Sequence, residues 1–157
     1  MPNHALLISV RPRFAEMIFA GTKVVELRRI RPRIGRGDLV FIYVSSPVKA
    51  LEGTFEVSEV ISDTPNSIWR RFNGRTGLLK WEFDAYYKGK QTAFAIVIHK
   101  CWQLPSPIRL AKLRQQKNGF HPPQSYHYIC RQAFAHIIGC KTGAGGSGRV
   151  KRSSGRQ

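Results

Sequence analysis

Short apolar runs, separated by turn-forming residues, dominate the chain up to Ile129. They predict strands over Ala5–Val10, Lys23–Arg28, Leu39–Val44, Lys49–Ile61, Thr92–Trp102 and Ser125–Ile129. Every position from Leu39 to Val44 is apolar, which is typical of a strand buried on both faces. Many short strands with few helices between them predict an α+β fold built on a small, partly closed β-barrel.

Short helices are expected to decorate this barrel. Pro12 is suited to the first turn of a helix, apolar residues follow it at helical spacing, and Gly21 stands where a helix-ending glycine belongs. Further helices are predicted after Thr64, over Leu78–Tyr87 and over Leu110–Gln116.

The net charge of the chain predicts which class of partner it binds. The chain has 157 residues, with 26 Lys and Arg against nine Asp and Glu, and a net charge of +17. A field of this sign attracts polyanions and speeds encounters with them. Nucleic acid is therefore the expected partner, and no basic amphipathic helix argues for a membrane surface.

The composition also bears on cellular location. No apolar run approaches the roughly 20 residues of a membrane-spanning helix, and the first residues lack the features of a signal peptide. Three cysteines do not form a disulfide framework, in agreement with a reducing compartment. A cytoplasmic location is expected.

The chain is expected to divide into a domain over residues 1–130 and an appendage over residues 131–157. The appendage is predicted to be a short helix followed by a flexible basic tail rich in Gly and Ser. Six of the basic residues and no acidic residue follow Ile129, so the domain itself is still strongly cationic. The tail either adds contacts to phosphates or has no role.

One motif makes the sequence recognisable. Gly21-Thr22-Lys23-Val24-Val25-Glu26-Leu27-Arg28 matches G-x-K-x-x-E-x-R, with a predicted helix before it and a Gly-Asp turn before the next buried strand. In this pattern the domain resembles the ASCH family, a relative of the PUA fold. The ending Pro122–Tyr128 is similar to a prokaryotic branch described as predicted transcriptional regulators.

The resemblance implies a mixed β-barrel of five or six strands with a cleft beside the motif. It also implies binding of RNA or of modified nucleosides. Some members of the family are hydrolases: an amidohydrolase that acts on N4-acetylcytidine, and a metal-dependent ribonuclease that acts on single-stranded RNA.

The motif residues suit a nucleic-acid ligand. Glu26 and Arg28 lie two apart on a strand and share one face. Arg28 can grip a phosphate or a base edge, and Glu26 can accept a hydrogen bond from an exocyclic amine or hold Arg28 in place. Lys23 must lie in the turn after Gly21 to join them. The alternative is a surface cluster that ties the helix to the strand.

A hydrolase would use Lys23 and Glu26 as its catalytic pair. In amidohydrolase relatives a Thr occupies the position of Glu26, and a Glu stands shortly before the second helix. Here Asn73-Gly74-Arg75-Thr76 offers no carboxylate. A nucleophilic hydroxyl and a general base are both missing from that pattern. Ser45 and Ser46 could supply hydroxyls or could simply cap the turn after a central strand.

Cations and aromatic residues complete the predicted interface. Trp69 is followed directly by Arg70 and Arg71, which gives one stacking group among cations, although the residue types favour the alternative that Trp69 anchors its helix to the barrel. Arginines are dense between Arg11 and Arg36. The predicted nucleic-acid-binding residues are Lys23, Glu26, Arg28, Arg11, Arg13, Arg29, Arg31, Arg33, Ser45, Ser46, Trp69, Arg70 and Arg71.

No metal or cofactor is predicted. His127, Cys130, His136 and Cys140 fall close together, but their short central gap is unusual for a zinc site. The hypotheses therefore rank an RNA-binding module first and a small hydrolase of RNA or of an acylated nucleoside second. A DNA-binding regulator ranks third, since no helix-turn-helix is visible. The oligomeric state cannot be read from the sequence.

Overall fold

A single curled sheet organises the molecule. The computed structural model describes residues 4–132 and 134, and its strands are β1 (His4–Val10), β2 (Val25–Arg28), β3 (Leu39–Val44), β4 (Ala50–Asp63), β5 (Ala93–Arg109) and β6 (Tyr126–Cys130). They form one six-stranded sheet in the order β2-β5-β4-β3-β1-β6. β1 and β3 are parallel and the other pairs are antiparallel. The prediction of an α+β fold with a small, partly closed mixed barrel is confirmed, and the six strands form a curled half-barrel.

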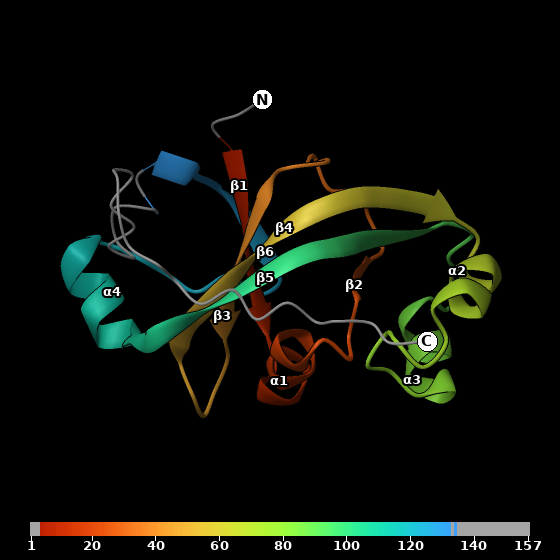
Figure 1. The fold of residues 1–157 in the computed structure, drawn as a ribbon, viewed down its shortest axis with the longest axis horizontal. Coiled ribbons are helices and arrows are strands. Elements are labelled where there is room, and N and C mark those ends of the chain that lie inside the picture. Colours follow the sequence, from red (N-terminus) through yellow and green to blue (C-terminus); the bar gives the residue numbers. More distant parts are fainter. Residues whose placement is uncertain (1–3, 133, 135–157) are drawn as a thin grey trace.

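The helices of the described chain lie around this sheet (Figure 1). They are α1 (Pro12–Ala20), α2 (Pro65–Phe72), α3 (Lys80–Tyr86) and α4 (Leu110–Gln116). α4 lies at one end of the long β4–β5 ribbon, and α2 and α3 lie at the other end. No helix in the described part is long and apolar enough to cross a membrane.

Local sequence explains where the first two helices begin and end. Pro12 occupies the first turn of α1, and Gly21 ends the helix with a φ of 80°, which glycine adopts without steric cost. Thr64 caps α2 by accepting a hydrogen bond from the Ser67 backbone N–H at 3.2 Å. The predicted helix boundaries are confirmed to within two residues at these ends.

Two apolar layers cover the central strands. Leu6, Ile8 and Ile42 belong to one core cluster, while Leu7 and Phe41 belong to another on the opposite face of the sheet. Successive residues of β1 and β3 thus enter different cores, as alternation along a strand requires. The prediction that Leu39–Val44 is buried on both faces is confirmed, and the same holds for β1.

β5 is longer than the sequence suggests. The strand was expected to end at Trp102, before two prolines, but it continues to Arg109. Its pairing with β4 shifts register between Leu51, which pairs with Ile108, and Gly53, which pairs with Gln103. The segment between them, which contains Pro105 and Pro107, therefore has no paired residues in β4. A bulge accommodates residues that cannot donate a ladder hydrogen bond, which explains the wrong boundary.

The two edges of the sheet are β2 and β6. They share no ladder, but the backbone N–H of Arg33, in the loop after β2, donates to the hydroxyl of Tyr128 at 2.7 Å. Side-chain contacts thus draw the edges together where strand pairing does not. The predicted short helix and basic tail over residues 131–157 lie almost wholly outside the described residues and stay a prediction.

Candidate nucleic-acid site

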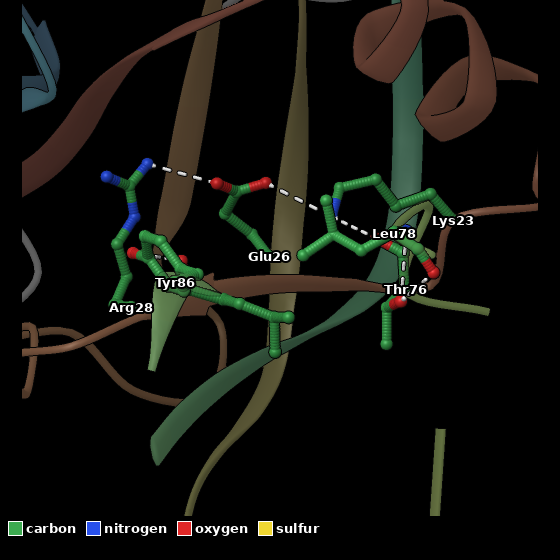
Figure 2. A network of polar contacts seen from close by, with 7 residues as sticks. Lys23, Glu26, Arg28, Thr76, Leu78 and Tyr86 are labelled. Carbon is green, nitrogen blue, oxygen red and sulfur yellow. Dashed lines mark hydrogen bonds and ion pairs between the residues drawn. The ribbon is translucent and has the colours of Figure 1, made fainter. Parts of the chain in front are cut away.

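The motif residues do come together. Lys23 lies in the non-regular segment between α1 and β2, as its expected role requires, and Glu26 and Arg28 lie on β2. The Lys23 Nζ is 3.6 Å from one Glu26 carboxylate oxygen, and an Arg28 Nη is 3.2 Å from the other. Figure 2 shows this row of ammonium, carboxylate and guanidinium, with Glu26 in the middle.

Neighbouring groups supply further hydrogen-bond acceptors to both cations. Lys23 donates to the backbone carbonyl of Thr76 at 2.7 Å, and Arg28 donates to the Ser125 hydroxyl at 2.7 Å. The Arg28 guanidinium also lies over the Tyr126 ring, 5.2 Å from its centroid. The row is therefore tied to protein groups at both ends.

Little of this row reaches solvent. Lys23 is 5% exposed and Arg28 is 7% exposed. Burial lowers the pKa of the Lys23 ammonium, while the Glu26 carboxylate opposes that shift. The three residues line neither the open pocket where β1 and β3 end nor the smaller pocket between the start of α2 and α3. Their direct contact with a ligand stays a prediction.

An open pocket of about 420 Å³ lies elsewhere, where β1 and β3 end. These parallel strands bring Val10 and Val44 side by side, and the chain leaves both strands into the pocket wall. The opposite wall is the segment that precedes β6. The lining residues are Ser9, Arg11, Tyr43, Ser45, Ser46, Lys49, Leu110, Pro122, Pro123 and Gln124.

The chemistry of this pocket is cationic and rich in hydroxyl groups. Arg11 and Lys49 are exposed, and no carboxylate belongs to the described residues that line it. Lys49 has a φ of 50°, a left-handed backbone conformation that is uncommon outside glycine and is found at functional sites. Such a pocket can hold an anion without a competing negative charge.

Tyr43 forms the pocket floor from the core side. Its ring is 2% exposed and packs against Phe120, with 6.5 Å between the ring centroids. Burial raises the pKa of its hydroxyl, which keeps the proton on the oxygen.

The predicted binding residues are divided between several places. Arg11, Ser45 and Ser46 line the pocket. Arg13 is paired with Glu82 of α3 and lies over the Phe14 ring. Arg29, Arg31 and Arg33 lie exposed in the loop between β2 and β3.

The aromatic residue singled out by sequence is a packing residue here. Trp69 lies 5.0 Å from Phe83, centroid to centroid, and so fixes α2 against α3. Arg70 donates to Ser67, and Arg71 forms an exposed ion pair with Glu59 at 3.8 Å. The contact of Trp69 with Phe83 agrees with the alternative interpretation, in which Trp69 anchors its helix.

Sequence reasoning missed Tyr43, Lys49 and Gln124 as pocket residues. Lys49 stands only three residues beyond Ser46, so a search of the whole turn after the buried strand would have found it. Tyr43 and Gln124 carry no local signal, because only the folded arrangement of β3 and the segment before β6 brings them together.

No group of three or more His, Cys, Asp or Glu side chains in the described part of the chain is placed to hold a metal ion. Of the four residues weighed for zinc, His136 and Cys140 lie outside the described residues.

Comparison with known proteins places this architecture in a family. The family model described as the ASCH domain matches residues 8–103, which include the motif and most of the sheet. A ribonuclease of Zymomonas mobilis, named for its ASCH domain, is 31% identical over 134 residues, which cover 84% of this chain and 88% of the relative.

A solved structure and a part of a longer protein also match this chain. The crystal structure of ASCH from Zymomonas mobilis matches with a TM-score of 0.80 and 26% identity, over 87% of this chain and 94% of that one. The large ribosomal subunit protein uL22 of Ureaplasma parvum is 31% identical over 128 residues, which make up 81% of this chain. The match covers only 40% of the length of that protein. The family match and the close relative together establish that the chain belongs to the ASCH domain family.

Proposed function

We propose that this protein binds single-stranded RNA, with a phosphate and its nucleotide held in the pocket at the ends of β1 and β3. One observation carries the proposal: Arg11 and Lys49 face an open pocket whose described lining has no carboxylate. Its volume of about 420 Å³ lies in the range of small-ligand sites and suits a single nucleotide.

Three serines, a tyrosine and a glutamine add neutral donors and acceptors beside the two cations. Phosphate contacts from cations supply affinity, while hydroxyl and amide groups orient sugar and base. The family also supports RNA as the partner, since the two curated relatives described above are named as a ribonuclease and a ribosomal protein.

Fluorescence anisotropy with a labelled single-stranded RNA at several salt concentrations tests the proposal. The double variant Arg11→Gln/Lys49→Gln should weaken binding by roughly tenfold or more and reduce the salt slope by about 1. A matched control is Lys88→Gln/Lys100→Gln, which removes two exposed cations outside the pocket and leaves the same net charge. Equal losses in both variants would reject the pocket in favour of general charge attraction.

RNA cleavage in the same pocket is a second candidate function. It is favoured by the position of Tyr43, which brings a hydroxyl group into the pocket lining together with Arg11 and Lys49. In such a reaction the ribose 2′-hydroxyl gives its proton to solvent water as its oxygen bonds to phosphorus, the bond to the 5′-oxygen breaks, and that leaving oxygen takes a proton. Tyr43 would donate this proton, and Lys49 would stabilise the charge on the phosphoryl oxygens.

Gel analysis of labelled RNA tests this candidate. Tyr43→Phe keeps the ring against Phe120 and should retain RNA binding while cleavage falls by about 10²-fold or more. Cleavage by Tyr43→Phe at the wild-type rate would remove Tyr43 from the chemistry. Wild-type protein that binds RNA without cleaving it would leave the binding function alone.

A further inference from the structure

The buried row of Lys23, Glu26 and Arg28 ends at the wall of the pocket. Arg28 donates to Ser125, and Ser125 directly follows Pro122, Pro123 and Gln124, which line the pocket. A charged network at the opposite sheet edge thus reaches the segment that shapes the proposed RNA site.

Ser125 is held from two sides. Its carbonyl accepts a hydrogen bond at 3.0 Å from the backbone N–H of Ser9, which is itself a pocket residue. Its hydroxyl accepts from Arg28 at 2.7 Å. The first bond attaches the wall to β1, and the second attaches it to β2. Arg28 therefore bridges the two edges of the curled sheet at the level of the pocket.

The row also fixes Arg28 itself. Glu26 lies between the two cations, and Lys23 is anchored by the Thr76 carbonyl, so the guanidinium has one favoured position (Figure 2). The Tyr87 hydroxyl donates to the Arg28 carbonyl at 3.1 Å and holds the backbone. The buried Arg28 Nε has no hydrogen-bond partner among the described residues, although an unpaired buried donor is unfavourable. The orientation of Arg28 thus serves its contacts with Glu26 and Ser125 at the expense of its own Nε.

We propose that Arg28 is a positioning residue that holds the 122–125 wall of the RNA pocket, with Glu26 and Lys23 holding Arg28. The proposal rests on the function proposed above. It gives the motif a role that its burial allows: the motif sets the shape of the pocket from behind and need not contact the ligand.

A double-mutant cycle on RNA affinity tests the coupling. Arg28→Lys keeps the charge but loses the planar fork, and Ser125→Ala removes only the hydroxyl to which Arg28 donates. Each single variant should weaken binding by about fivefold to tenfold, and the double variant should bind no more weakly than the weaker single variant. Ser125→Thr, which keeps the hydroxyl, should restore affinity to within about twofold of wild type. Multiplicative losses, or no loss in Arg28→Lys, would overturn the proposal.

Hydrogen exchange separates this proposal from the function on which it rests. Without RNA, Arg28→Lys and Ser125→Ala should both speed amide exchange in the 121–126 segment, while Ser62→Ala, at an exposed serine of β4, should not. Faster exchange with no RNA binding in wild type would reject the RNA function and keep the tether. Unchanged exchange in both variants would reject the tether itself.

Discussion

Glu26 is a single carboxylate that serves two buried cations. Its oxygens lie 3.6 Å from the Lys23 ammonium and 3.2 Å from the Arg28 guanidinium. A buried charge that loses its partner pays for its desolvation without compensation, so the removal of one member of such a group costs more than the group contributes.

Glu26→Gln should therefore lower the free energy of unfolding by about 3 kcal/mol. The exposed pair of Glu59 and Arg71, 3.8 Å apart, supplies the control. Glu59→Gln should change the free energy of unfolding by less than about 1 kcal/mol. Urea unfolding of both variants measures the difference. Equal small effects would mean that the row is solvated.

Gly53 shows a different constraint, one of space. A Cβ at this position would lie 2.3 Å from the Trp102 carbonyl oxygen and 2.7 Å from the Phe19 ring. Gly53→Ala should destabilise the protein by about 1–3 kcal/mol, because β5 and α1 must move to admit it. Gly35→Ala is the matched control, since nothing lies within 4 Å of its added Cβ. Thermal unfolding that does not separate the two variants would contradict this packing.

At the scale of elements, the sequence predicted most of the fold because periodicity is a local property. The all-apolar run of β3 and the proline and glycine that bound α1 locate these elements without tertiary information. The end of β5 could not be found in this way. The local sequence predicts that the strand ends before its prolines, and only pairing with β4 extends the strand to Arg109.

His127 on β6 makes the stability of the folded protein depend on pH. Burial, with a smaller contribution from Lys117, lowers the pKa of His127 below its ordinary value of 6.5. As the pH falls through 6.5 the unfolded chain takes up a proton that the folded chain still rejects. Stability present above pH 6.5 is therefore lost as the pH approaches the lower folded pKa.

His127→Gln should flatten this part of the stability profile. The fall in melting temperature between pH 7.5 and pH 5 should be smaller in the variant than in wild type. Scanning calorimetry across that range measures it. Parallel profiles for the two proteins would show that His127 does not titrate differently in the folded state.

At the scale of the whole molecule, residues that are close in sequence are separated in space. Arg11 lies where β1 ends, whereas Arg31 and Arg33 lie in the loop that precedes the start of β3, which runs parallel to β1. The six residues of β3 span roughly 20 Å. The density of arginines suggested one surface, but the fold places Arg11 at one end of the central strands and the loop that contains Arg31 and Arg33 before the other end. The candidate site was predictable only at Arg11, Ser45 and Ser46, which directly follow strands that the sequence located.

This separation predicts an effect of RNA length. Arg31→Gln/Arg33→Gln should reduce affinity for a longer RNA, of about 12 nucleotides, and lower its salt slope by about 1. Binding of a dinucleotide, which is too short to span the roughly 20 Å from the pocket to the loop, should change by less than about twofold. Anisotropy with both RNAs provides the comparison. Equal losses for the two lengths would place the loop beside the pocket.

Photo-crosslinking of a thiouridine-substituted RNA, followed by mass spectrometry of the attached peptides, tests the central claim most directly. The account predicts crosslinks in the peptides that contain residues 43–49 and 122–124, which form the two walls of the pocket. These crosslinks should disappear with an excess of unlabelled RNA. Crosslinks confined to the 29–38 loop or to α2, with none in the pocket walls, would contradict it.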